Sequence, residues 1–562
     1  MRITLIVTLL IVYSSLYSQL SPSKSYALHG DLKSSNLSIE CSQDEIQELI
    51  NLQLESERKN VIYPVGKLIP LQLDLMQKAE WTYDEFDNRI GKLTIHSTGA
   101  TGLGVYFSDF FLPIGAKFSA YSPSQSESIG PFSFVDNPKE KGFGSGTING
   151  EFLVLEVFIP KGTKALPQLK IGHLGYQRNP RLMKNKASRD FGDSKDCQVN
   201  VLCDEGDDWQ DKKNAVVRIK MVFGGFEGWC TGTIMNNTYQ DCTPYVLTAD
   251  HCRHSSDGSV AAESEYANWE FYFQYESTKC KSPSSEGSVK NVKLTGCTRK
   301  ASGDNGGEGD PDFLLLRLNN VIPQTYNPHF AGWDKRGLIS TSGVMIHHPA
   351  GDIKKISTFV NAVESSEWDA TKGKDTHWKL TWSKTKNGFG VSEGGSSGSA
   401  LWNQDKRVVG QLTGGSSACE EGNGTGPFNP DYFGKFSAAY HWNLSDSTRN
   451  LLYWLDNGRN NAFTMDGINW PCNELPLTKS ETQKDNHLIR IFPNPAQNQV
   501  TLTKKEEGPL HVIIYDGLGQ QVLEKTLVDN DFQIDVSSWT KGIYMINYQS
   551  NNLFGTLKLN VQ

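Results

Sequence analysis

The sequence is organised around one stretch, Gly390-Val391-Ser392-Glu393-Gly394-Gly395-Ser396-Ser397-Gly398-Ser399-Ala400-Leu401-Trp402. Gly395 and Gly398 allow a tight turn whose backbone N–H groups point at one spot. A serine at position 397 of such a turn can attack a carbonyl carbon, and those N–H groups would bind the oxyanion that develops. A Gly/Ser-rich surface loop explains the same motif when it is taken alone. Ser397 is therefore a candidate nucleophile only if the chain also supplies a histidine base and a buried carboxylate.

The composition indicates a multidomain protein with no obvious polyanionic partner. The chain has 562 residues, of which 37% are hydrophobic, and this length predicts three or four structural units. The net charge is -8 and the pI is near 5.9. No block of lysine and arginine stands out, so nothing favours nucleic acid or an anionic membrane as partner. We expect no cofactor, and a monomer.

The N-terminus is typical of a secretory signal peptide. Met1-Arg2 precedes the apolar run Ile3–Tyr13, which small residues follow, and this predicts a signal peptide over residues 1–18. A transmembrane anchor is the alternative, but the run is well short of the required length of about 20 residues.

Ten cysteines follow that segment, and eight of them fall between residues 197 and 419. In an exported chain this clustering indicates disulfides. Zinc is disfavoured because no C-x-x-C pair has a second metal-binding pair, so no metal site is expected. Spacing leaves the connectivity open. The cysteines are Cys41, Cys197, Cys203, Cys230, Cys242, Cys252, Cys280, Cys297, Cys419 and Cys472.

The chain divides into an N-terminal β-rich region, a cysteine-rich region and a short C-terminal unit. Residues 19–190 contain short strand-like runs and predict an all-β structure that ends in a basic, polar linker suited to cleavage. Residues 191–472 again read strand after strand, and a helix is expected near residues 445–458. Residues 473–486 are a polar linker, and 487–562 predict a small β-sandwich. The expected strands are at residues 92–96, 104–107, 117–121, 152–159, 215–219, 245–248, 268–275, 313–318, 499–502, 511–515 and 542–548.

Two motifs supply partners for Ser397. The strand Tyr245-Val246-Leu247 runs into Thr248-Ala249-Asp250-His251-Cys252, where a disulfide from Cys252 to Cys230 would fix the histidine. A carboxylate at the start of a buried strand would be costly unless the histidine satisfied it, and Asp312, directly before Phe313-Leu314-Leu315-Leu316, meets that description. Asp310 is the competing carboxylate.

T-A-D-H-C, D-F-L-L-L-R-L and G-S-S-G-S, in the order His, Asp, Ser, resemble the chymotrypsin-like serine proteases, and the surrounding residues are most similar to the bacterial lysyl endopeptidases. The resemblance covers roughly residues 195–460. It rests further on segments 197–206, 229–232, 331–334, 346–349 and 408–412.

The resemblance implies a chymotrypsin-like double β-barrel with the site between the barrels. His251 is then the general base, Asp312 orients it, and Ser397 attacks, with the N–H groups of Gly395 and Ser397 as oxyanion hole. Ser396 stands where trypsin-like zymogens have aspartate, which argues against activation by insertion of a freed N-terminus.

The resemblance also implies disulfides Cys197–Cys419, Cys203–Cys280 and Cys230–Cys252. Cys242 and Cys297 remain in the first barrel, and we expect them to pair. Cys41 and Cys472 are left without a partner.

Substrate specificity is implied in the same way. Asp431 matches the family residue that binds a lysine ammonium, and Trp368 matches the tryptophan that shields the catalytic histidine. Thr413 departs from the family, which has histidine there, and this leaves strict lysine preference open.

The flanking regions resemble a propeptide at 19–190 and the sorting domain of type IX secretion at 487–562. The sequence therefore predicts a secreted or surface-bound serine endopeptidase made as a zymogen, cleaving after lysine, with its own propeptide and the type IX machinery as partners. The alternatives are an arginine-preferring or broadly trypsin-like protease and a catalytically silent binding module. Self-maturation at Lys186, Arg189 or Lys195 is expected, with Lys195 or Lys186 favoured.

Overall fold

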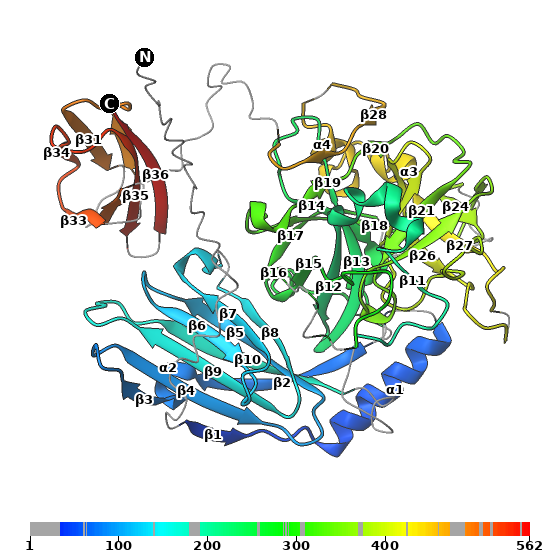
Figure 1. The fold of residues 1–562 in the computed structure, drawn as a ribbon, viewed down its shortest axis with the longest axis horizontal. Helices are drawn as coiled ribbons and strands as arrows, with labels where there is room; N and C mark the ends of the chain where they lie inside the picture. Colours follow the sequence, from blue (N-terminus) through cyan, green and yellow to red (C-terminus); the bar gives the residue numbers. More distant parts are fainter. Residues whose placement is uncertain are drawn as a thin grey trace, which may run out of the picture. The chain divides into compact units, whose positions relative to one another are not determined.

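The structure is a computed structural model that describes residues 34–472 and 489–562, and the chain forms two compact units, Met1–Leu475 and Pro476–Gln562 (Figure 1). The predicted signal peptide and the linker at 473–486 lie outside the described residues. The internal gaps are 60–61, 63, 139–140, 179–190, 256–258, 285, 287–288, 290–291, 304–309, 369–374, 423–424, 459, 505–509, 517–520 and 551–552.

The N-terminal region, residues 34–178, consists of two β-sheets that enclose their own hydrophobic core. Leu93 and Leu155 enter this core from one sheet, and Leu103 and Leu174 enter it from the other. The first sheet contains β1 (Ser35–Ser38), β3 (Glu80–Tyr83), β4 (Arg89–His96), β6 (Lys117–Tyr121), β7 (Ser128–Phe132) and β9 (Phe152–Ile159). The second contains β2 (Pro64–Asp74), β5 (Gly102–Phe111), β8 (Phe143–Asn149) and β10 (Gln168–Gln177).

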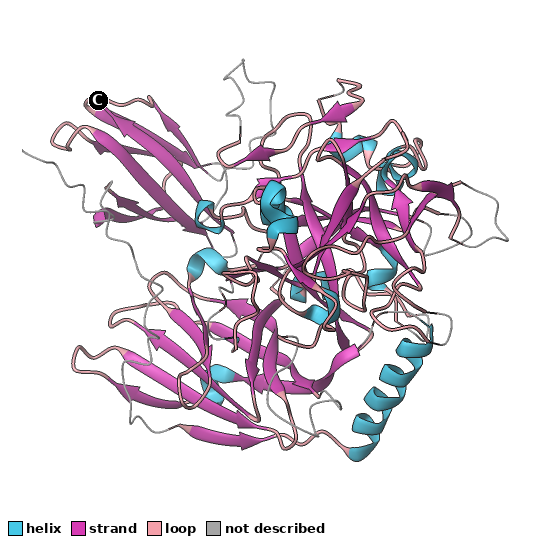
Figure 2. Ribbon diagram, turned by 45° about the vertical axis from the view of Figure 1, so that its right-hand side comes forward, coloured by secondary structure: helices cyan, strands magenta, loops and turns pink. Residues whose placement is uncertain are grey.

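One long helix departs from the all-β prediction for this region. Helix α1 spans Gln43–Lys59 (Figure 2). Ser42 and Glu45 form a reciprocal capping pair at its start, since the backbone N–H of Ser42 donates to Glu45 and that of Glu45 donates to the Ser42 hydroxyl. The S-x-x-E pattern was present in the sequence, and the β prediction overlooked it.

The second sheet continues into the cysteine-rich region. β2 pairs antiparallel with β13 (Phe226–Met235), with Lys67 opposite Phe226 and Gly66 opposite Glu227. The two regions therefore share one continuous sheet.

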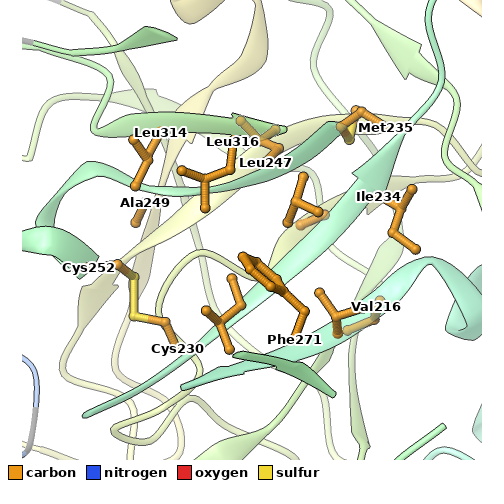
Figure 3. Close-up of a cluster of buried hydrophobic side chains, with 14 of the residues drawn as sticks. Val216, Cys230, Ile234, Met235, Leu247, Ala249, Cys252, Phe271, Leu314 and Leu316 are labelled. Atoms are coloured by element: carbon orange, nitrogen blue, oxygen red, sulfur yellow. A yellow bond between two sulfur atoms is a disulfide. The ribbon is translucent and has the colours of Figure 1, made fainter. Parts of the chain in front are cut away.

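The first barrel is antiparallel and holds the predicted strands of residues 215–318. Its strands are β12 (Val216–Phe223), β13, β14 (Tyr245–Ala249), β15 (Glu270–Phe273), β16 (Val292–Thr295), β17 (Cys297–Ser302) and β18 (Phe313–Leu318). Figure 3 shows side chains of β12, β13, β14, β15 and β18 meeting in the core, beside the Cys230–Cys252 disulfide.

The second barrel follows and completes the predicted double-barrel fold. The order of its strands is β11 (Val199–Asn200), β22 (Lys355–Phe359), β21 (Gly343–His347), β25 (Ala400–Asn403), β26 (Val408–Gly415), β27 (Asp431–Lys435), β24 (His377–Leu380) and β23 (Glu364–Ser366). β20 (Trp333–Asp334) and β28 (Thr464–Met465) extend it, and β19 (His329–Phe330) pairs with β29 (Ile468–Asn469). Short helices α2 (Leu75–Lys78), α3 (Phe436–Tyr440) and α4 (Leu452–Leu455) connect strands.

The single helix predicted near residues 445–458 is wrong. Asp446 does cap a turn, but this turn is a 3-10 segment, Ser447–Arg449, and α4 is separate. Asn450 is extended between them, and its side-chain amide donates to the carbonyls of Asn443 and Asp446 while its oxygen accepts from Tyr453 N–H. Such local side-chain bonds compete with the helix and interrupt it.

The cysteines form Cys197–Cys419, Cys203–Cys280 and Cys230–Cys252, which are the pairs that the resemblance implied. The expected Cys242–Cys297 pair is wrong, because Cys242 bonds to Cys472. Cys297 is buried in β17 as a free thiol whose Sγ contacts the Tyr266 carbonyl, and Cys41 is also free and buried.

The second unit is a two-sheet sandwich around an apolar core, as predicted. One sheet contains β30 (Ile489–Phe492), β31 (Gln499–Lys504) and β34 (Asp531–Asp535). The other contains β33 (Gln521–Leu527), β32 (Leu510–Tyr515), β35 (Gly542–Ser550) and β36 (Leu553–Val561). Across the described residues, no helix is both long and apolar enough to span a membrane.

Candidate active site

The first barrel places His251 against Asp312. β14 and β18 pair with Ala249 opposite Phe313, so the residues that follow one strand and precede the other are neighbours. The Nδ1 atom of His251 lies 2.8 Å from Oδ2 of Asp312, and the backbone N–H of His251 donates to Oδ1 at 2.9 Å. The disulfide Cys230–Cys252 ties the His251 turn to β13. Both the position and the ring orientation of the histidine are thereby fixed.

Each member of this pair stabilises the charged form of the other. Burial lowers the pKa of His251, but the Asp312 carboxylate outweighs burial and raises this pKa above its ordinary value. Burial raises the pKa of Asp312, and His251 outweighs it and lowers this pKa. When His251 accepts a proton, the ionised carboxylate of Asp312 stabilises the positive charge of its ring.

Asp310, the competing carboxylate, hydrogen bonds to the backbone of Asp312. Asp312 has a left-handed backbone, with a φ of 52°, and its N–H donates to Oδ1 of Asp310 at 2.7 Å. Its carbonyl accepts from the N–H of Asp250 at 3.0 Å. The carboxylate in contact with the histidine ring is that of Asp312.

A second histidine lies behind Asp312. The hydroxyl of Thr413 hydrogen bonds to the Asp312 carboxylate, and Nε2 of His377 lies 3.1 Å from the same hydroxyl. Burial lowers the pKa of His377 to about 4, so its ring is neutral near pH 7. A neutral ring protonated on Nε2 donates to Thr413, which leaves the Thr413 proton for Asp312. Neither residue was assigned this arrangement from the sequence.

The loop that carries Ser397 packs directly on the strand that leads to His251. A Cβ added to Gly398 would lie 2.0 Å from Oγ1 of Thr248 and 2.7 Å from the Ala249 nitrogen, so only glycine fits there. Thr231 anchors the loop twice, because its N–H donates to the Ser397 carbonyl at 2.9 Å and its hydroxyl donates to the Gly395 carbonyl at 2.8 Å. The half-buried Ser397 is thus held beside the His251 turn.

The backbone of this loop offers two unused donors. Gly395 has a φ of 93°, which glycine adopts at little cost. Within the described part of the chain, the N–H groups of Gly395 and Ser397 donate to no protein acceptor. Two such donors flanking a nucleophile are what binding of a developing oxyanion requires.

Ser396, which replaces the zymogen aspartate, is locked by a buried histidine. Its Oγ lies 2.7 Å from Nδ1 of His347 and accepts from the Glu393 N–H at 3.1 Å. Nε2 of His347 lies 3.1 Å from the Ser357 hydroxyl. Burial lowers the pKa of His347 to about 3, so the ring stays neutral. Ser396 is thus held by hydrogen bonds to a neutral side chain and not by an ion pair. The sequence motif Ile346-His347-His348-Pro349 contained this residue, but its partner was not apparent.

Asp431 begins β27 and is fully buried beside the same loop. Oδ2 accepts from Trp382 Nε1 and from the Ser417 hydroxyl, both at 2.7 Å, and Oδ1 accepts from the Ser417 N–H at 3.3 Å. Burial raises the pKa of Asp431, while bonds from Ser417, Trp382 and Ser392 act in the opposite direction. Among the described residues, no cationic side chain pairs with it. A buried carboxylate of this kind favours a cation that enters from outside.

The ring contacts of Trp368 are with residues of β24 and β27. Its side chain is 46% exposed, and its ring contacts are with Tyr432 at 5.5 Å and with His377 at 6.4 Å between centroids. No aromatic contact joins Trp368 to His251 among the residues that the structure places. Shielding of the catalytic histidine by Trp368 remains a prediction.

Residues 191–434 match the family model of the lysyl endopeptidase, C-terminal domain, and residues 490–562 match that of the secretion system C-terminal sorting domain. The chain is similar to the protease Anisep from Arthrobacter nicotinovorans at 14% identity, covering 40% of this chain and 90% of that one with a TM-score of 0.27. A Glu endopeptidase is 17% identical over 44% of this chain and 92% of its own, with a TM-score of 0.26.

The sorting domain indicates export to the medium or the cell surface through type IX secretion. Residues 191–434 thus form a serine endopeptidase domain of the lysyl endopeptidase type, and residues 490–562 form the sorting domain that follows it.

Proposed function

We propose that this enzyme hydrolyses peptide bonds after basic residues, with lysine favoured, through His251, Asp312 and Ser397. The observation that carries the proposal is the 2.8 Å contact between His251 and Asp312 beside a serine loop with two unused N–H donors. The neutral His251 removes the proton of Ser397 as Oγ attacks the scissile carbonyl carbon. The N–H groups of Gly395 and Ser397 bind the oxyanion.

The imidazolium then protonates the leaving amine, which departs and leaves an acyl group on Ser397. A water molecule repeats the attack with His251 as base and frees the carboxylic acid. Asp312 keeps its negative charge throughout and holds the ring in the tautomer whose Nε2 faces Ser397.

Preference for lysine rests on Asp431. A lysine ammonium reaching this buried carboxylate meets an anion already hydrogen bonded by Ser417 and Trp382. Arginine is the second candidate, because Thr413 replaces the family histidine. Profiling cleavage of a peptide library tests the choice: most cuts after lysine support the proposal, and a preference for neutral residues contradicts it.

Maturation before Phe191 fits the packing better than a cut after Lys195, which is one of the two favoured sites. Phe191 is buried with Tyr275, Val289 and Ile353, the N–H of Gly192 donates to Asp352 at 2.7 Å, and that of Lys195 donates to Glu393 at 3.1 Å. A cut after Lys195 would detach these contacts from the protease. Cleavage after Lys186 or Arg189, which lie outside the described residues, would keep them. The intact mass of the secreted enzyme decides between the two.

The tail is proposed as an export address alone, because it forms a compact unit with its own core. Deleting residues 487–562 should stop release from the cell. Loss of peptidase activity in protein refolded without the tail would show that the tail belongs to the enzyme.

A further inference from the structure

The surface of the first barrel that faces the N-terminal region carries a buried group of four charged residues that the proposed mechanism does not use. They are Lys220, Glu227, Glu270 and Lys293, with side chains at most 8% exposed. Glu270 forms ion pairs with Lys220 and Lys293, and the Nζ atom of each lysine lies 3.1 Å from a carboxylate oxygen of Glu270. Two positive and two negative charges are therefore buried together. Away from water, each charged side chain is stable only while its ion-pair or hydrogen-bond partners are in place.

Within the first barrel the Tyr272 hydroxyl donates to Glu270, and the N-terminal region supplies further hydrogen bonds to the group. Tyr106 donates its hydroxyl to Oε1 of Glu227 at 2.5 Å, and Gln177 donates to Oε2 at 2.7 Å. On the other side, Nζ of Lys220 donates to the Thr147 hydroxyl at 3.0 Å. Nζ of Lys293 donates to the carbonyl of Gly144 at 3.3 Å.

Glycines of the N-terminal region make room for these side chains. A Cβ on Gly175 would lie 2.5 Å from Oε1 of Glu227, and one on Gly66 would lie 2.9 Å from its Oε2. A Cβ on Gly144 would lie 2.7 Å from Oε1 of Glu270, and one on Gly146 would lie 2.8 Å from Nζ of Lys293. The surfaces of the N-terminal region and of the first barrel are therefore complementary in shape around the charged group. A region that served only as a covalent extension of the protease would not require this complementarity.

Strand pairing extends the contact. β2 adds to β13 at residues 226–228, and the N–H of Leu68 donates to the Gly225 carbonyl at 2.8 Å. Two and three residues beyond Gly228, the same strand carries Cys230 and Thr231, which hold the His251 turn and the Ser397 loop. Docking and active-site support thus lie on one strand.

We propose that residues 34–178 are a specific binding partner of the protease domain and stay bound to it after the linker at 179–190 is cut. They are held by the pairing of β2 with β13 and by the residues that surround the Glu227 side chain, here called the Glu227 socket: Tyr106, Gln177, Gly175 and Gly66. The inference rests on the proposed precursor. It assigns the product of the first cut as a two-fragment complex.

The test uses the full chain with Ser397→Ala, so that binding is measured without activity. A recognition site for an unrelated protease is inserted between Lys184 and Asn185, and the chain is cut there under native conditions. The two fragments should elute as one peak from a sizing column at micromolar concentration. Separation into two peaks would overturn the proposal, whereas failure of the catalytic assignment would leave the result unchanged.

Tyr106→Phe and Tyr121→Phe form a matched pair for the socket. Both remove a buried tyrosine hydroxyl that donates to glutamate, to Glu227 across the interface in one case and to Glu156 within the N-terminal region in the other. Tyr106→Phe should weaken binding of the cut fragment at least about tenfold, as expected for loss of a hydrogen bond to a charged group. Equal affinities for the two variants would contradict the role of the Glu227 socket.

Discussion

Replacing Asp431 by asparagine tests the lysine pocket, because the two side chains differ little in shape and the charge is lost. The Trp382 indole and the Ser417 hydroxyl can still donate to the asparagine oxygen, and the bond lost is the longer one of 3.3 Å from the Ser417 N–H, which the amide nitrogen cannot accept. The substrate ammonium loses its anion. An ion pair at about 4 Å gives about 4 kcal/mol at an effective dielectric constant of about 20, before desolvation is subtracted.

Hydrogen bonds to charged groups contribute about 1.5–3 kcal/mol net, which corresponds to about 10- to 150-fold in kcat/KM for a lysine substrate. The assay compares matched peptides with lysine, arginine or norleucine before the cut bond. Norleucine has the lysine stem without its charge, so its cleavage should hardly change in the variant.

Asp334→Asn is the control, since Asp334 is also a buried carboxylate of the second barrel but pairs with Arg336. A loss of similar size for lysine and norleucine would show that Asp431 supports structure only. Unchanged cleavage after lysine would remove Asp431 from the pocket.

Three further predictions concern the triad and the cysteines. Because Asp312 raises the pKa of His251 above its ordinary value of 6.5, kcat/KM should fall as the pH drops through that raised pKa and the base becomes protonated; in Asp312→Asn the acid limb should move to lower pH, and an unmoved limb would contradict the pairing. Thr413→Val should lower kcat about tenfold with little change in KM, since Asp312 loses a hydrogen bond and His377 loses its acceptor, while Thr413→Ser should keep activity; equal kcat in both variants would exclude this role. Peptide mapping under non-reducing conditions should find Cys242 joined to Cys472, and Cys472→Ala should cost about 2–5 kcal/mol of unfolding free energy whereas Cys297→Ala costs less; a Cys242–Cys297 peptide would refute the pairing.

Local sequence was sufficient where a short pattern determines the structure. The run Phe313–Leu318 is the strand β18 over its full length, because six residues with four buried aliphatic side chains fit a central strand. The order of the histidine, aspartate and serine motifs was equally informative. Asp312 could be preferred over Asp310 because it directly precedes that strand.

Long-range pairing could not be predicted in this way. Cys242 and Cys472 are separated by 230 residues, and cysteine spacing carries no information on which partner folding brings near. The pairing of β2 with β13 could not be predicted either, because the residues of one strand do not indicate which other strand it will pair with. His377 is linked to Asp312 by hydrogen bonds through the Thr413 hydroxyl, and neither β24, which carries His377, nor β26, which carries Thr413, was among the strands expected from the sequence. Helix α1 is a different case, because its capping pair was present and was outweighed by the β-rich surroundings.

Covalent labelling of Ser397 tests the central claim most directly. The secreted protein is treated with a fluorophosphonate probe, and the adduct is mapped by mass spectrometry beside a Ser397→Ala variant. A single adduct on Ser397, absent from the variant and prevented by protonation of His251 at low pH, is the predicted result. An adduct on another residue, or labelling that survives Ser397→Ala, would contradict the assignment.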